Sequence, residues 1–247
     1  MKGIILAGGK GTRLAPATHV TNKHLLPILH KPMILYPLET LKALGIKDIL
    51  IVSGGNHIGG FAEFLGDGSE YGVSLTYRVQ KEAGGIAQAL GLGKDFAQGK
   101  GVSVVLGDNV FDNRQFERIG QKLVSGPQQI VFDPRTHAML FLKTVPDPER
   151  FGVPVLNEQG HIVSIEEKPK EPKSPYAVTG LYYYPPDVFD VIPTLKPSAR
   201  GELEISDVNN YYVARGRCLS IKLPGFWSDA GTPESLYRTA SWAMTQV

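Results

Sequence analysis

The sequence predicts an α/β protein built on a mostly parallel, mixed sheet with helices on its faces. Two observations support this fold class. The apolar run at residues 49–52 is continuous, which is typical of a strand buried on both faces, and residues 3–7 and 102–106 are predicted to be further buried strands. Apolar residues at helical spacing begin at Ile34 and again at Ile58, so that strands and helices alternate along the chain.

The first half is expected to run as follows. Residues 14–32 have no clear period and are predicted as a functional loop. A helix follows from Ile34 and ends near Gly45, because glycine commonly terminates helices. A short helix from Ile58 then leads into a strand at 73–79.

The second half repeats this organisation more loosely. Residues 162–165 alternate like a half-buried strand, and residues 176–184 form another strand whose tyrosines are expected to pack. Thr232 and Pro233 are predicted to be the N-cap and first residue of the last helix.

Composition excludes several classes of protein. The 247 residues carry a formal net charge of +2 and contain no block of Lys and Arg, so a nucleic-acid partner is not expected. No apolar run approaches the ~20 residues of a membrane-spanning helix, and no membrane association is expected. Cys218 is the single cysteine, which excludes an internal disulfide and fits a cytoplasmic protein.

The first strand leads into a loop with glycines at three of the four positions 8–11, followed by Arg13. A strand that ends in bare backbone exposes N–H groups that can bind a phosphate chain. Lys10 and Arg13 would add positive charge beside those amides. The alternative is an ordinary tight turn between a strand and a helix.

Two common phosphate loops do not fit this segment. The Walker pattern requires Ser or Thr after Gly-Lys, but Lys10 is followed by Gly11. The dinucleotide fingerprint requires a third glycine where this chain has Leu14.

A longer pattern does fit. Residues 8–16 read Gly-Gly-x-Gly-Thr-Arg-Leu-x-Pro, Lys23 follows about ten residues after the arginine, and residues 31–33 read Lys-Pro-Met. This segment resembles the nucleotide-binding signature of the sugar nucleotidyltransferase family, and most closely that of its glucose-1-phosphate thymidylyltransferases. The resemblance extends over nearly the whole chain and implies a Rossmann-like, nucleotide-diphospho-sugar transferase fold.

The resemblance also implies a reaction, in which dTTP and α-D-glucose 1-phosphate give dTDP-glucose and pyrophosphate. A sugar-phosphate oxygen would attack the α-phosphorus in line, with Arg13, Lys23 and Lys168 as the catalytic cations. Two alternatives stay open: the same chemistry with UTP or another hexose 1-phosphate, and a regulator that binds a nucleotide sugar without making it.

The segment 79–90 is a second candidate for nucleotide binding, because a glycine pair separates a strand from a helix. The Gln80 amide can both donate and accept, so it can pair with a pyrimidine edge. A plain helix start is the alternative. Many members of the family have an acidic residue where this chain has Gly84. The resemblance implies that the nucleotide is bound by Leu6, Gly8, Gly9, Lys10, Gly11, Thr12, Arg13, Gln80, Gly85 and Asp108.

Asp108 follows the strand at 102–106 and would face the crevice at its carboxyl end, although a helix cap is an alternative. Asp229 lies on the loop before the last helix. At ~4 Å and an effective dielectric constant near 20, two such charges repel by about 4 kcal/mol, a cost that a divalent cation removes. The resemblance implies Mg²⁺ ligands at Asp108 and Asp229, since Mg²⁺ prefers oxygen.

Sugar contacts are implied by the resemblance in the second half. The Glu166-Glu167-Lys168 cluster would otherwise be an exposed charged surface. Glu202 and Glu204 could pair with Arg200 or start a helix. The implied sugar-phosphate site consists of Asn109, Gly152, Glu167, Lys168, Val178 and Arg200.

The chain is expected to form one domain, with a nucleotide-binding half at 1–110 and a sugar-phosphate-binding half at 111–247. Longer members of the family have a helical C-terminal extension linked to feedback regulation and subunit packing. Because residue 247 follows soon after the Pro233 helix, we expect a short form of the family, either a monomer or a small homo-oligomer.

Overall fold

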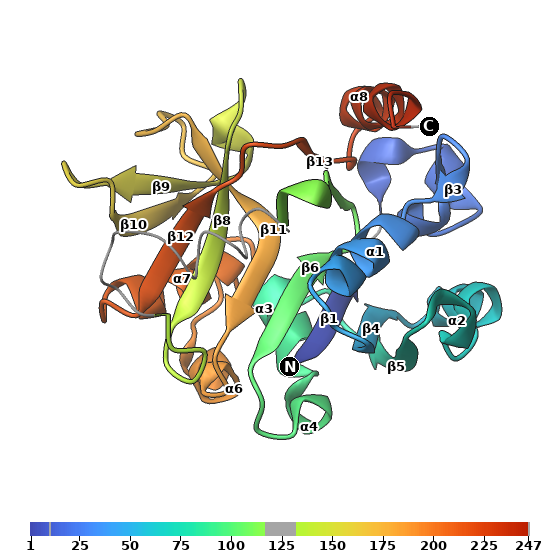
Figure 1. Ribbon diagram of the computed structural model, residues 1–247, viewed down its shortest axis with the longest axis horizontal. Helices are drawn as coiled ribbons and strands as arrows, with labels where there is room; N and C mark the ends of the chain where they lie inside the picture. The colour runs from blue at the N-terminus through green and yellow to red at the C-terminus, as the bar shows by residue number, and fades with distance from the viewer. Residues whose placement is uncertain (10, 117–131, 247) are drawn as a thin grey trace.

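The computed structural model describes residues 1–9, 11–116 and 132–246. Its centre is a seven-stranded sheet with strand order β12-β8-β11-β6-β1-β4-β5. In Figure 1 the N-terminal strands lie beside the strands of the second half, so that both halves of the chain contribute to one sheet.

One side of the sheet is parallel. Strand β1 (Lys2–Ala7) lies between β4 (Asp48–Gly54) and β6 (Val102–Leu106), and β5 (Ser74–Gln80) pairs with β4. All four strands run in the same direction, so their carboxyl ends share one edge of the sheet. In open α/β sheets this is the edge at which ligands bind.

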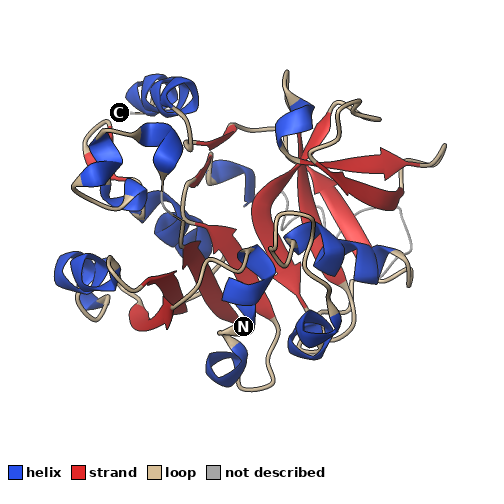
Figure 2. Cartoon of the chain, turned by 180° about the vertical axis from the view of Figure 1, so that it is seen from behind, coloured by secondary structure: helices blue, strands red, loops and turns tan. Residues whose placement is uncertain are grey.

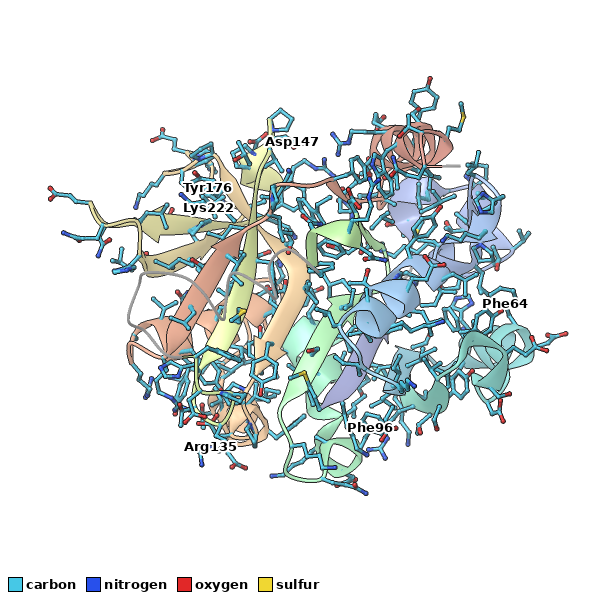
Figure 3. All side chains as sticks on the ribbon, in the orientation of Figure 1. Phe64, Phe96, Arg135, Asp147, Tyr176 and Lys222 are labelled. Atoms are coloured by element: carbon cyan, nitrogen blue, oxygen red, sulfur yellow. The ribbon has the colours of Figure 1, made fainter. Side chains whose placement is uncertain are left out.

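The other side reverses direction. Strand β11 (Tyr176–Tyr184) is antiparallel to both β6 and β8 (Ala138–Thr144), and β12 (Cys218–Lys222) is parallel to β8. The sheet is therefore mixed, as predicted. Tyr182–Tyr184 are buried, which confirms that these tyrosines pack. Lys222 lies 4.5 Å from the centre of the Tyr176 ring, and Figure 3 shows the two residues together.

Helices cover both faces of the sheet. On β1, Ile5 and Ala7 point to one apolar cluster while Ile4 and Leu6 point to the other, because side chains of a strand alternate. The first cluster is covered by α1 (Leu35–Ala43) and α2 (Ile58–Leu65).

The second cluster is covered by short helices, which Figure 2 shows from behind. These helices are α3 (Ile86–Gly91), α4 (Lys94–Ala97), α6 (Val188–Val191) and α7 (Ile205–Val213). Burial of both sheet faces explains the continuous apolar runs of the central strands.

Three two-stranded sheets flank the central one. Their members are β9 (Gly152–Leu156) with β10 (Ile162–Glu167), β7 (Asn109–Phe111) with β13 (Trp227–Asp229), and β2 (Pro27–Ile28) with β3 (Lys31–Pro32). Short 3-10 turns occur at Thr12–Leu14, Ala17–His19, Lys23–Leu25, Ser69–Tyr71, Pro148–Arg150 and Ile192–Thr194. The segment predicted as a loop at 14–32 therefore holds tight turns and one small hairpin.

The last helix, α8 (Pro233–Met244), begins as predicted. The Thr232 hydroxyl accepts a hydrogen bond from Ser235 N, and the Ser235 hydroxyl accepts one from Thr232 N, which completes a capping box. The helix packs on a small apolar cluster, in which the Trp242 and Phe226 rings stack at 4.3 Å. In the described ranges, no helix has both the length and the apolar character needed to cross a membrane.

We expect Thr232→Ala to lower the free energy of unfolding by about 1 kcal/mol, because it leaves N–H groups of the first turn without an acceptor. For a domain of this size the melting temperature would fall by about 2–4 °C. The matched control is Ser241→Ala, an exposed position in the same helix, which should leave the melting temperature nearly unchanged. Equal melting temperatures for the two variants would contradict the role of the cap.

Candidate active site

A cavity of about 440 Å³ opens at the carboxyl ends of β1, β5 and β6. These strands contribute Leu6, Gln80 and Leu106, while residues of β9, β10, β11 and α7 form the opposite wall. The cavity thus lies beside the β6–β11 pair, where the sheet changes from parallel to antiparallel. The first wall combines exposed backbone with charged side chains such as Lys23 and Asp108, and the second presents Glu167, Lys168 and Arg200.

The glycine loop belongs to the first wall, where Gly8 and Gly9 line the cavity. Gly9 and Gly11 have φ of 94° and 63°, a left-handed backbone that favours glycine. A Cβ on Gly11 would lie 2.9 Å from Thr18 and 3.2 Å from Lys23, so the loop is packed directly on the segment that carries Lys23. Lys10 lies outside the described residues.

The two aspartates meet through the pairing of β7 with β13. In this antiparallel pair Asp229 is the register partner of Asn109, the residue after Asp108. Gly231 lies beside them, because a Cβ there would be 3.3 Å from Asp108 Oδ2 and 3.1 Å from an Arg13 guanidinium nitrogen. Two carboxylates far apart in sequence and one arginine therefore converge, as the resemblance implied.

Asp108 is a partly buried, ionised carboxylate. Lys23 Nζ donates to its Oδ2 at 2.6 Å, and Asn109 Nδ2 donates to its Oδ1 at 2.9 Å. Burial by itself would raise the pKa of Asp108. The positive charge of Lys23 and these hydrogen bonds outweigh burial and hold the pKa well below its ordinary value.

Asp229 is in a less favourable environment. Burial raises its pKa, the negative charge of Asp108 raises it further, and Arg150 opposes both effects. The Arg150 guanidinium donates to Asp229 Oδ2 at 2.9 Å and is itself held by Asp147. Figure 3 labels Asp147, near the top of the view. The other oxygen, Oδ1, is buried and accepts no hydrogen bond from the described residues.

His24 lies next to this pair and is neutral. Burial, together with the positive charge of Lys23, lowers its pKa to about 3. Its Nδ1 is 2.7 Å from Asn22 Oδ1, and a Cβ on Gly107 would be 2.7 Å from the imidazole ring. The neutral ring therefore packs against Gly107, the residue before Asp108, and adds no charge to the site.

The opposite wall holds charged groups on β10 and on the loop before α7. Glu167 is the register partner of Gly152, and its Oε2 accepts from Ser206 at 2.6 Å. Lys168 Nζ lies 3.6 Å from Glu167 Oε1, and the Lys168 backbone is left-handed with φ of 46°. This wall therefore presents a carboxylate and an ammonium side by side.

The Arg200 guanidinium is held by a neighbouring glutamate. Glu204 is buried and accepts from Arg200 Nε at 3.2 Å and from a terminal nitrogen at 2.8 Å. Glu202 is more distant, at 3.7 Å. Arg200 therefore pairs mainly with Glu204, which is one of the alternatives that the sequence left open, and its contact with a sugar phosphate stays a prediction.

Most of the predicted site residues line this one cavity. They are Leu6, Gly8, Gly9, Arg13, Lys23, Gln80, Gly85, Asp108, Asn109, Gly152, Glu167, Lys168, Val178, Arg200 and Asp229. Gly11 and Thr12 are not among its lining residues. The Asn109 side chain is already occupied, since it donates to Asp108 and its oxygen accepts from Gly180 N and Trp227 Nε1. Its contact with a substrate stays a prediction.

The sequence patterns did not single out Arg150, Gly231 or Gln88. Arg150 lies in a segment that reads as a turn, and its only distinguishing sign is a basic residue directly before Phe-Gly-Val. Gly231 leaves room for the Arg13 and Asp108 side chains, and Gly84 leaves room for the Gln88 amide. No local sequence pattern indicates such space.

The donor set limits what the cavity could bind. Within the described ranges, no three His, Cys, Asp or Glu side chains form a metal cluster. Two carboxylates with one buried, unpaired oxygen suit a hard cation that takes its remaining ligands from a substrate and water. The surrounding Lys and Arg side chains suit phosphate groups.

Residues 2–246 match the family described as "Nucleotidyl transferase". Among curated relatives, a glucose-1-phosphate thymidylyltransferase of Neisseria meningitidis is 47% identical over 99% of this chain and 83% of its own length. One of Mycobacterium tuberculosis is 41% identical, with the same two coverages.

Solved structures agree with this match. A protein of Bacillus anthracis, named as a candidate glucose-1-phosphate thymidylyltransferase and solved with a sucrose, is 50% identical. It superposes with a TM-score of 0.87 over 98% of this chain and 95% of its own. A UDP-glucose pyrophosphorylase complexed with UDP-glucose shares the fold, with a TM-score of 0.82, full coverage of this chain and 99% coverage of its own, at 23% identity. The chain with this glycine loop and carboxylate pair therefore belongs to the nucleotidyl transferase family.

Proposed function

We propose that this enzyme joins dTTP and α-D-glucose 1-phosphate to form dTDP-glucose and pyrophosphate. The observation that carries the proposal is the convergence of Asp108 and Asp229 in a cavity with a glycine loop on one side and Lys168 and Arg200 on the other. The names of relatives at 41–47% identity support this pair of substrates.

The reaction requires no nucleophilic side chain, because the attacking sugar-phosphate oxygen is already anionic. The protein must position two anionic substrates and reduce their repulsion. We assign Arg13, with Lys10, to the departing phosphates, where a guanidinium can bind two oxygens at once. Lys23 and Lys168 then face the meeting phosphates from opposite walls of the cavity.

The remaining residues bind the two substrates without reacting. We assign the base to Gln80 and Gly85, and the phosphate chain to the backbone of the glycine loop. The contacts assigned to the sugar phosphate are the Gly152 and Val178 backbone, Asn109, Glu167 and Arg200. With this assignment, residues 1–110 form the nucleotide half and residues 111–247 the sugar-phosphate half.

Nucleotidyl transferases generally use a divalent metal, and we propose Mg²⁺ held by Asp108 and Asp229. The unpaired, buried Oδ1 of Asp229 fits this role. When bound, the cation would supply positive charge beside the α-phosphate and balance the two carboxylates. Because dTTP is a cytoplasmic metabolite, the proposed reaction belongs in the cytoplasm.

Pyrophosphate release across a grid of nucleotides and sugar phosphates tests the function. We expect the highest kcat/KM for dTTP with glucose 1-phosphate, and lower values for UTP or other hexose 1-phosphates. A higher kcat/KM for UTP than for dTTP would show that UTP is the nucleotide substrate. Tight binding of dTDP-glucose without pyrophosphate release in the presence of Mg²⁺ would support a regulator instead.

Arg13→Ala and Asp108→Asn should each lower the rate of pyrophosphate release by about 10³-fold or more. Arg13→Ala removes a positive charge assigned to the departing phosphates, and Asp108→Asn removes a carboxylate assigned to the cation. The control is Arg114→Ala, which removes an exposed arginine outside this cavity. Circular dichroism would confirm that the variants fold. Near-normal turnover in either site variant would contradict its assigned role.

Asp229→Asn should weaken Mn²⁺ binding by about tenfold or more, since it removes one of the two negative charges that would hold the cation. Electron paramagnetic resonance of free Mn²⁺ measures this without turnover. The control is Asp95→Asn, which changes an exposed carboxylate on α4 that does not line the cavity. Removal of metal with EDTA should stop the wild-type reaction, and added Mg²⁺ should restore it. Equal Mn²⁺ affinity in the two variants would remove Asp229 from the metal site.

A further inference from the structure

A short chain of hydrogen bonds ends at Gln80 on the cavity wall. Gln80 Nε2 donates to Gln88 Oε1 at 2.8 Å and to the Gly85 carbonyl oxygen at 3.3 Å. Gln88 Oε1 also accepts from Gly84 N at 3.2 Å. Gln88 itself is not among the residues that line the cavity.

Two backbone groups fix the direction of both side-chain amides. The Gly84 N–H can only donate, so Gln88 must turn its oxygen toward it. That oxygen and the Gly85 carbonyl can only accept, so Gln80 must turn its NH₂ group toward them. A flip of either amide would place donor against donor or acceptor against acceptor. The Gly84 N–H also donates to the Glu82 carbonyl oxygen at 2.9 Å, so a flip of Gln88 would leave the Gln80 NH₂ group, and not Gly84 N, without its partner.

The consequence is an acceptor on the cavity wall. With its NH₂ group held, Gln80 presents Oε1 over the glycine loop, where a Cβ on Gly8 would lie only 2.8 Å from it. Gln80 Oε1 accepts no hydrogen bond from the described residues. The cavity therefore offers a free acceptor on Gln80, beside Gly85, which also lines it.

Pyrimidine bases differ in the groups that this pair would meet. Thymine and uracil carry a donor at N3–H flanked by carbonyl acceptors, whereas cytosine has an acceptor at N3 and a donor at its amino group. A fixed Gln80 oxygen pairs with N3–H and opposes the cytosine N3. A freely rotating Gln80 amide would pair with either base.

We infer that Gln88 is a positioning residue that makes the site select thymine and uracil over cytosine, by locking Gln80 with its oxygen toward the base. The inference rests on the proposed function, because it takes the base to lie against Gln80. Gln88 lies outside the cavity, yet it would decide whether the base meets the oxygen or the NH₂ group of Gln80. Selection between thymine and uracil, which share N3–H, would not depend on it.

Gly84 provides the second observation. A Cβ at this position would lie 2.4–2.7 Å from all three heavy atoms of the Gln88 amide group. A side chain at residue 84 and the Gln88 amide therefore cannot occupy the same space. Gly84→Ala should displace the Gln88 amide without changing any residue of the hydrogen-bonded chain.

The experiment compares kcat/KM for dTTP, dUTP and dCTP in wild type and three variants. In Gln88→Met, which keeps the side-chain length but loses the acceptor, the preference for dTTP over dCTP should fall by about tenfold or more. Gly84→Ala should have the same effect. In Gln88→Glu, whose carboxylate still accepts from Gly84 N and Gln80, the preference should persist. The ratio of dTTP to dUTP should stay constant in all of them.

An unchanged preference for dTTP over dCTP in Gln88→Met or Gly84→Ala would overturn the inference. A parallel fall of the dTTP to dUTP ratio would also overturn it, because that pattern reports general damage to the cavity. If Gln88→Met does not fold by circular dichroism, Gly84→Ala gives the same comparison. Failure of the proposed function would show separately, as wild-type protein that releases no pyrophosphate from dTTP. The base preference is then read from nucleotide binding by calorimetry.

Discussion

The repulsion between Asp108 and Asp229 is the constraint around which this site is organised. The β7–β13 pairing forces these carboxylates together in a buried cavity, where like charges are costly. Lys23 balances one and Arg150 the other, yet the balance is unequal: the pKa of Asp108 is lowered while that of Asp229 is raised. The site is therefore neutralised by its own side chains, but one buried oxygen of Asp229 still has no partner.

Asn109 connects these charges to the rest of the molecule. Its amide group donates to Asp108, and its oxygen accepts from the Gly180 backbone on β11 and from the Trp227 indole on β13. A Cβ on Gly180 would lie 2.6 Å from this side chain, so the contact requires glycine at this position. One buried amide thus fixes the sheet, the small β7–β13 pair and the carboxylate relative to one another.

The sequence was sufficient for the fold class and for much of the site, but for different reasons. Continuous apolar runs and helical spacing are local signals, and they predicted β1, β4, β6 and α1 as well as the Thr232 cap. The glycine loop and the resemblance pointed to Arg13, Lys23, Lys168 and Arg200, and all four line one cavity.

The proximity of Asp108 to Asp229 was not predictable from residue patterns. It depends on a strand register between segments 118 residues apart, as the bond between Asn109 and Trp227 shows. Gln88 was not singled out because its contacts with Gln80 and Gly84 N depend on the fold and on the space that Gly84 leaves. A local sequence pattern indicates which residues are present. It does not indicate the register of β7 and β13 or the space that Gly84 leaves for Gln88.

The left-handed backbone of Lys168 has a consequence for how this protein can evolve. A non-glycine residue in that conformation costs about 1–2 kcal/mol, which glycine would avoid. Glycine has no ammonium group, however, so relief of the strain would remove the cation that this wall presents beside Glu167. Under the proposed function, a change of Lys168 to glycine would therefore gain stability and lose a charge that the reaction uses.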